Sequence, residues 1–160
     1  MPPRPNQRCT TWRTILNGLP RPDWDTYFLA GARWAATRAD CTRARVGALL
    51  VSHRNEVLKT GYNGAPSGVP GCASRGACPR GKLDTDACLP GSDYSNCIAD
   101  HAERNAIRRC PPSELRGATL YSTREPCPAC WTLIEAAGIR RVVWLGNDTE
   151  NIFKRDFEVH

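Results

Sequence analysis

Hydrophobic side chains recur along the chain at two spacings, which separate predicted helices from predicted strands. The first amphipathic stretch predicts a helix that begins at Asp23 or Asp25, either of which can cap it, and ends near Ala39. Its buried face is expected at apolar positions three or four residues apart: Trp24, Phe28, Ala32 and Ala35.

Two apolar runs predict a β-hairpin, residues 46–51 and residues 57–61, joined by a turn around Arg54 and Asn55. Residues 62–96 are rich in Gly, Pro, Ser, Asp and Cys and show no sustained periodicity. A loop of this length inside a compact domain usually serves function or is pinned, here by its cysteines. Regular structure is predicted to resume with a helix from Cys97 or His101 to Arg109, a strand from Ala118 to Ser122, a helix from Pro128 to Ala137 ended by Gly138, and a strand from Arg141 to Leu145.

Strands that alternate with helices at this spacing predict an α/β fold of two or three layers, with ligands at the strand–helix junctions. A chain of 160 residues is most simply one domain, which we expect over residues 23–160. Residues 1–22 combine five prolines with polar residues and predict a Pro/Arg-rich N-terminal extension.

The net charge of +6 suggests nucleic-acid binding, but much of this charge lies in the N-terminal extension. Residues 1–22 carry four arginines and no acidic residue, whereas residues 23–149 carry 16 basic and 13 acidic side chains. The basic residues form no run interleaved with aromatics, so a polynucleotide groove is not expected. Nine cysteines, an odd number, without a signal sequence or a transmembrane run indicate reduced thiols and metal ligands in a cytoplasmic protein.

Two short motifs supply the ligands of a catalytic zinc ion. His101-Ala102-Glu103 offers an imidazole and a carboxylate, and Cys127-Pro128-Ala129-Cys130 offers two thiolates three residues apart. Three protein ligands leave a fourth position for water, which zinc activates near neutral pH. Glu103, in the first turn of the helix that His101 opens, is the candidate general acid/base.

Each motif alone has other interpretations. The C-P-A-C sequence also suits a thioredoxin-like redox pair or half of a structural zinc knuckle, and H-A-E alone carries little information. Their order, each at the start of a predicted helix, favours the catalytic zinc.

The H-x-E and P-C-x-x-C motifs resemble those of zinc nucleobase deaminases. Over residues 23–146 the chain resembles the deoxycytidylate deaminase family of the cytidine deaminase superfamily, with its layered fold and mixed sheet. Further matching segments are Cys41-Thr42-Arg43, Arg45-Val46-Gly47-Ala48, Gly61-Tyr62-Asn63-Gly64-Ala65-Pro66-Ser67-Gly68, Gly117-Ala118-Thr119-Leu120-Tyr121 and Glu125-Pro126-Cys127.

This resemblance implies hydrolytic deamination of dCMP to dUMP with release of ammonia. Glu103 would take a proton from the water that zinc activates, pass it to N3 of the ring and then protonate the departing amine. By analogy, the backbone N–H of Ala102 would bind the pyrimidine O2, and Asn63 the deoxyribose. Asn63 is otherwise an ordinary turn asparagine.

The 5′-phosphate has three candidate arginine ligands, Arg43, Arg45 and Arg124, although such an arginine is more often a solvated surface residue. Tyr94 is expected either to cover the base or to pack. The resemblance also implies a second, structural zinc, with buried unliganded thiols as the alternative. Its candidate ligands are Cys41, Cys72, Cys97, Cys78 and Cys88.

One departure from the family follows Gly146. Only residues 147–160 remain where the family continues into a further helix and strand, so we expect four or five strands. Family members are often homo-oligomers and some respond to dCTP and dTTP, which makes self-association and these effectors expectations for this chain.

Two rival functions remain open. One is a zinc deaminase that acts on a C5-modified dCMP, a nucleoside or a base in nucleic acid. The other is a non-catalytic zinc-binding module for nucleic acid, which predicts that Glu103 is dispensable.

Overall fold

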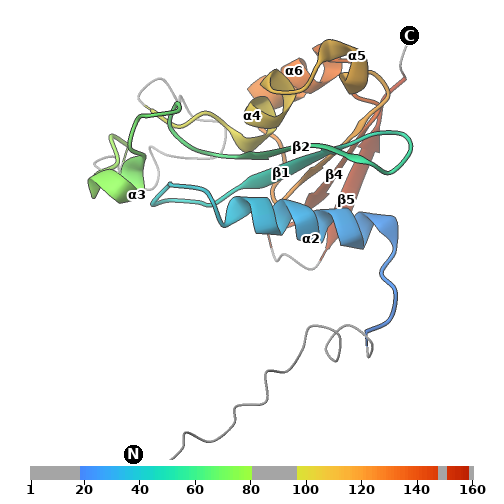
Figure 1. The fold of residues 1–160 in the computed structure, drawn as a ribbon, viewed down its shortest axis with the longest axis horizontal. Helices are drawn as coiled ribbons and strands as arrows, with labels where there is room; N and C mark the ends of the chain where they lie inside the picture. The colour runs from blue at the N-terminus through green and yellow to red at the C-terminus, as the bar shows by residue number, and fades with distance from the viewer. Residues whose placement is uncertain (1–18, 81–96, 148–150, 159–160) are drawn as a thin grey trace, which may run out of the picture.

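The computed structural model describes residues 19–80, 97–147 and 151–158. Within these residues five strands form one mixed sheet in the order β2-β1-β3-β4-β5 (Figure 1). β1 is antiparallel to both β2 and β3, β3 is parallel to β4, and β4 is antiparallel to β5. The strands are β1 (Gly47–Val51), β2 (Val57–Tyr62), β3 (Thr119–Ser122), β4 (Arg141–Leu145) and β5 (Ile152–Asp156).

Helices cover both faces of this sheet, which makes the fold three-layered. Helix α2 (Trp24–Ala36) lies on one face, and α4 (Ala102–Arg108) and α6 (Pro128–Ala136) lie on the other (Figure 1). The short helices α3 (Cys72–Arg75) and α5 (Pro112–Leu115) complete the described elements. The α/β class and the order of the main elements are therefore as predicted.

The residues of β1 show why the central strands are continuously apolar. All five are buried, because Ala48 and Leu50 point into the core beneath α4 and α6 while Leu49 and Val51 point into the core beneath α2. A strand covered on both faces has no need of polar alternation.

Two glycines let helices lie directly against the strands. A side chain at Gly47 would collide with the carbonyl oxygen of Ala32 in α2, and one at Gly61 with the carbonyl oxygen of Ala102 in α4. Gly61 therefore sets the height of the start of α4 above β2.

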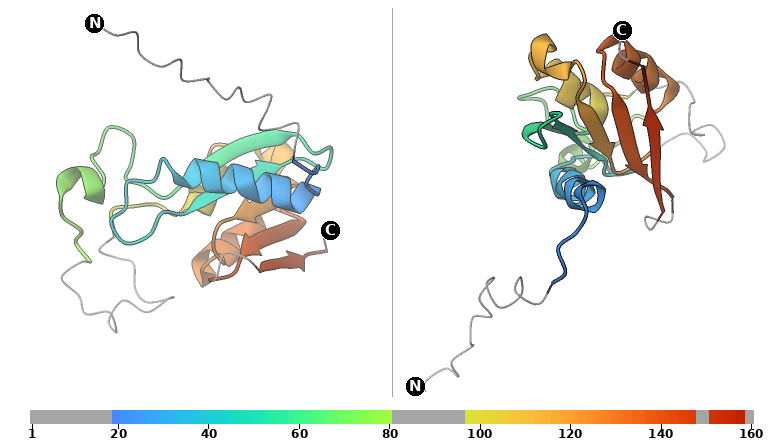
Figure 2. Two further views of the ribbon diagram at one scale, coloured as in Figure 1. Left: turned by 90° about the horizontal axis from the view of Figure 1, so that it is seen from below. Right: turned by 90° about the vertical axis from the view of Figure 1, so that its right-hand side faces the viewer.

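At the edges of the fold, one expectation needs correction and one open alternative is decided. Trp24 was expected in the buried face of α2, but it is 50% exposed, because it begins the helix just after the Asp23 cap and stacks on Phe28. A fifth strand, which the short C-terminus left in question, is present as β5 at the outer edge of the sheet (Figure 2). All of its residues are exposed, so its sequence lacks the alternation of apolar and polar residues by which a half-buried strand is recognised.

Part of the long loop after β2 is held by a carboxylate. Asp40 accepts hydrogen bonds from the backbone N–H of Gly71, at 3.0 Å, and from the N–H and hydroxyl of Ser74, at 3.0 and 2.7 Å. These bonds, led by that of the Ser74 hydroxyl, lower the pKa of Asp40. Asp40 thus anchors α3 to the segment before β1, independently of the cysteines.

No helix in the described parts of the chain combines the length and the apolar character needed to cross a membrane.

Candidate metal centre and active site

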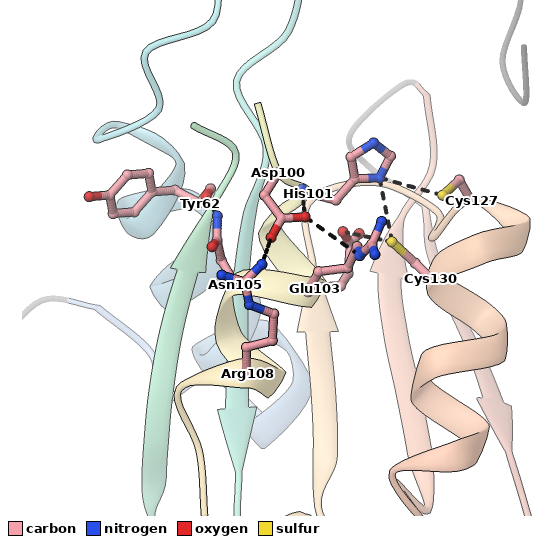
Figure 3. A network of polar contacts seen from close by, with 9 residues as sticks. Tyr62, Asp100, His101, Glu103, Asn105, Arg108, Cys127 and Cys130 are labelled. Atoms are coloured by element: carbon pink, nitrogen blue, oxygen red, sulfur yellow. Dashed lines mark hydrogen bonds and ion pairs between the residues drawn. The ribbon is translucent and has the colours of Figure 1, made fainter. Parts of the chain in front are cut away.

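Three potential metal ligands meet where α4 and α6 begin. His101 is the N-cap residue of α4, Cys127 is the N-cap residue of α6, and Cys130 lies in the first turn of α6. The imidazole Nδ1 of His101 lies 3.4 Å from the sulfur of Cys127 and 3.4 Å from that of Cys130 (Figure 3). In the described part of the chain, this is the one group of three or more His, Cys, Asp or Glu ligands whose atoms all lie within 4.8 Å.

These separations fit a zinc ion. With Zn–N and Zn–S bonds of about 2.0 and 2.3 Å at a tetrahedral angle, the nitrogen and each sulfur should lie roughly 3.5 Å apart. The donor set of one imidazole and two thiols is also one that zinc prefers, and three ligands leave a coordination position open. The residues therefore fit zinc, the metal that the two motifs predict.

The electrostatics of Cys130 add a second argument for a cation. Its side chain is fully buried, and burial, followed by the nearby Glu103 and Cys127, raises the pKa of its thiol. A bound cation would supply the missing stabilisation of the thiolate.

Glu103 lies beside the ligands without belonging to their group. It is 4% exposed, and burial raises the pKa of its carboxyl against the opposing effect of its hydrogen bonds. Its Oε1 accepts a hydrogen bond from the Ser122 hydroxyl at 3.0 Å, and its Oε2 faces the sulfur of Cys130 at 3.7 Å. A carboxyl group held in this position can exchange a proton with a molecule at the open coordination position.

Asn63 uses its side-chain amide to join two segments of backbone. Its Oδ1 accepts from the N–H of Val46 and its Nδ2 donates to the carbonyl oxygen of Ala44, both at 2.8 Å. This is the structural role expected of a turn asparagine, and contact with a deoxyribose stays a prediction. Ala102, the first residue of α4, is fully buried, and its backbone contact with the pyrimidine also stays a prediction.

The three candidate phosphate ligands line one cavity. Arg43, Arg45 and Arg124 share a space of about 570 Å³ with a fourth arginine, Arg33 of α2, and no Asp or Glu lies among its lining residues. Arg43 also donates to the carbonyl oxygen of Arg80, at 3.2 Å. Two of its lining residues, Thr123 and Arg124, belong to the segment between β3 and the first cysteine of the cluster.

Sequence reasoning missed Arg33 and Ser122. Arg33 lies on α2, in a different element from the other arginines, and carries no local signal. Ser122 did carry a signal in the sequence, since it is a polar residue that ends an apolar strand just before the cysteine motif.

The predicted second metal site is only partly described. Cys41, Cys72, Cys78 and Cys97 lie near one another, but no three of them meet the 4.8 Å condition that the first group meets. Burial raises the pKa of Cys72, and the thiols of the other three raise it further. Cys88 and Tyr94 lie outside the described residues.

Comparisons with known proteins agree with this geometry. Residues 22–146 match the family model of the cytidine and deoxycytidylate deaminase zinc-binding region. A deoxycytidylate deaminase of Mycobacterium phage D29 is 53% identical over 131 residues, which cover 79% of this chain and 97% of the relative. A deoxycytidylate deaminase of Schizosaccharomyces pombe is 39% identical, but the match spans only 37% of that longer protein.

Solved structures show the same architecture. The crystal structure of the dCMP deaminase from cyanophage S-TIM5 in complex with dCMP and dUMP superposes with a TM-score of 0.55 at 26% identity. The match covers 79% of this chain and 83% of that one. Together with the ligand geometry, these similarities show that the chain belongs to the cytidine and deoxycytidylate deaminase family of zinc-binding proteins.

Proposed function

We propose that this protein catalyses the zinc-dependent hydrolytic deamination of dCMP to dUMP, with release of ammonia. The observation that carries the proposal is the cluster of His101, Cys127 and Cys130 with the buried carboxyl of Glu103 beside it. The names of the phage and yeast relatives and of the cyanophage structure support dCMP as the substrate.

The residues divide the chemistry between them. When bound, zinc supplies the Lewis acidity that makes water a nucleophile near neutral pH. His101, Cys127 and Cys130 would hold the ion. Glu103 would accept one proton from the water and deliver it to N3 as the oxygen adds to C4. It would then carry the proton of the new C4 hydroxyl to the amine, which leaves as ammonia while the C4 carbonyl forms.

A substrate panel tests this proposal. Ammonia release should be fastest with dCMP in a series that also contains 5-methyl-dCMP, 5-hydroxymethyl-dCMP, deoxycytidine, dCTP and a short single-stranded DNA. A clear preference for a modified dCMP, the nucleoside or the DNA would replace dCMP with that substrate. Release from none of them would favour the non-catalytic zinc module.

We further propose that the arginine cavity receives the 5′-phosphate. We expect that at least one of the replacements Arg43→Ala, Arg45→Ala and Arg124→Ala raises KM for dCMP roughly 10- to 100-fold, the cost of a charge-assisted hydrogen bond. Steady-state kinetics with deoxycytidine should change less than about twofold in the same variants, because the nucleoside has no phosphate to lose.

Arg38→Ala is the matched control, since Arg38 is an exposed arginine just beyond α2 that does not line the cavity. Equal losses with dCMP and deoxycytidine, or no loss in any of the three variants, would contradict this phosphate site.

The cysteines outside the metal centre provide a separate test. If Cys41, Cys72, Cys78 and Cys97 contribute to a structural zinc, with or without Cys88, the purified protein should contain two zinc ions per chain. Cys72→Ala should then retain one ion and lose thermal stability, whereas Cys110→Ala, which removes another buried cysteine, should retain two. Elemental analysis measures the ratio, and one ion in the parent protein would indicate unliganded buried thiols instead.

Other properties also belong to the proposal. We propose a homo-oligomer, responses to dCTP and dTTP, and a catalytic domain over residues 23–160 after the N-terminal extension. We propose a cytoplasmic location as well, which suits the seven cysteines that the structure describes as free thiols.

A further inference from the structure

Ser122 lies where the sheet meets the catalytic carboxyl, and no motif accounts for it. It ends β3, is fully buried and is paired on both sides, with Ala48 of β1 and Trp144 of β4. A hydroxyl in this position is fixed by the backbone of two neighbouring strands. Such a group does not remain buried unless it has a hydrogen-bond partner.

The partner of the Ser122 hydroxyl is Glu103. The hydroxyl donates to Oε1 at 3.0 Å and accepts from the backbone N–H of Arg124 at 3.4 Å. Since that N–H occupies the oxygen as a donor, the hydroxyl proton is directed toward the carboxyl group. Ser122 thereby connects Glu103 to the segment that leads into the cysteine motif.

The two oxygens of Glu103 have different surroundings. Oε1 is bound by Ser122 on the side of the sheet, while Oε2 faces the Cys130 sulfur on the side of the metal ligands. Rotation of the carboxyl group about its last torsion would break the bond to Ser122. Terminal torsions of this kind are otherwise broad, so a single donor has a large influence on the orientation.

We propose that Ser122 is a positioning residue, whose hydroxyl fixes the carboxyl plane of Glu103 so that Oε2 stays directed at the reacting molecule. This inference rests on the proposed role of Glu103 in proton transfer. Ser122 itself touches neither the ligand cluster nor, in this scheme, the substrate. Its effect is therefore expected in the catalytic step rather than in binding.

The central test is Ser122→Ala in the zinc-loaded protein. We expect kcat with dCMP to fall roughly 10- to 100-fold, the range typical of residues that orient catalytic groups, while KM and zinc content change less than about twofold. Thr119→Val, which removes a hydroxyl elsewhere on β3, is the control and should leave kcat unchanged. An unaltered kcat in Ser122→Ala would overturn the proposal, and so would loss of zinc or of the fold, which would indicate a structural role.

A pair of variants of equal size isolates the hydroxyl. Ser122→Thr keeps it and Ser122→Val does not, so kcat of the threonine variant should exceed that of the valine variant by about tenfold or more. Equal kcat values in the two would overturn the proposal.

The combination with Glu103→Gln separates this inference from the proposed function. If Ser122 acts through Glu103, Ser122→Ala should change the residual turnover of Glu103→Gln less than about twofold. A full loss in that background would overturn the positioning role. Full turnover in Glu103→Gln alone would refute the proposed role of Glu103 in catalysis. An inactive Glu103→Gln together with a fully active Ser122→Ala would refute only the positioning role of Ser122.

Discussion

Replacement of Glu103 by glutamine is expected to lower kcat for dCMP by about 10²- to 10⁴-fold, the contribution typical of a positioned general acid/base. Glutamine has nearly the same shape and can still accept the hydrogen bond from Ser122. It cannot take up and return a proton, so the variant should fold, bind zinc and fail in catalysis. The measurements are kcat for ammonia release, zinc per chain and the melting temperature.

A control is available on a neighbouring helix. Glu135 of α6 is half exposed, at 51%, and lies near Arg155 rather than the metal ligands. Glu135→Gln should leave kcat unchanged. Retained turnover in Glu103→Gln would remove the case for this proton shuttle and would favour a non-catalytic role for the zinc.

Loss of a metal ligand should have an effect at least as large. In Cys127→Ala we expect one zinc ion fewer per chain and a loss of turnover of at least roughly 10³-fold, since Lewis-acid stabilisation is worth several kcal/mol and each 1.36 kcal/mol is a factor of ten. Cys127 is preferable to the fully buried Cys130, because its removal disturbs the core less. Elemental analysis and ammonia release measure the two effects.

Thermal unfolding gives an independent measure of the same site. Zinc added to the metal-free parent should raise its melting temperature by mass action, and the same addition to Cys127→Ala should produce a smaller shift. Cys110→Ala, which removes a buried cysteine of the same fold outside the cluster, should behave like the parent. Full zinc content and turnover in Cys127→Ala would exclude this cysteine as a ligand.

The parts of the fold that were predictable are those in which local pattern and burial agree. β1 is continuously apolar because helices cover both faces, and α2 repeats its apolar residues at helical spacing. Capping adds the boundaries, since Asp23 caps α2 through the N–H of Thr26. Of the predicted buried face of α2, only Trp24 at the start of the helix differs.

Other features depend on contacts between separate elements, which no pattern within one segment could reveal. β5 forms through backbone hydrogen bonds to β4 and buries none of its side chains. The anchoring of α3 depends on Asp40, 31 residues before Gly71. At the site, the short motifs predicted the ligand cluster, whereas the contribution of Arg33 to the cavity and the contact of Ser122 with Glu103 required the packed layers.

The close approach at Gly61 constrains how this protein can change. The imidazole of the ligand cluster comes from the start of α4 and the two sulfurs come from α6. The distance between them therefore depends on how closely α4 packs on β2, and Gly61 allows that close packing because it has no side chain. Libraries that aim at new pyrimidine nucleotides should therefore keep position 61 unchanged.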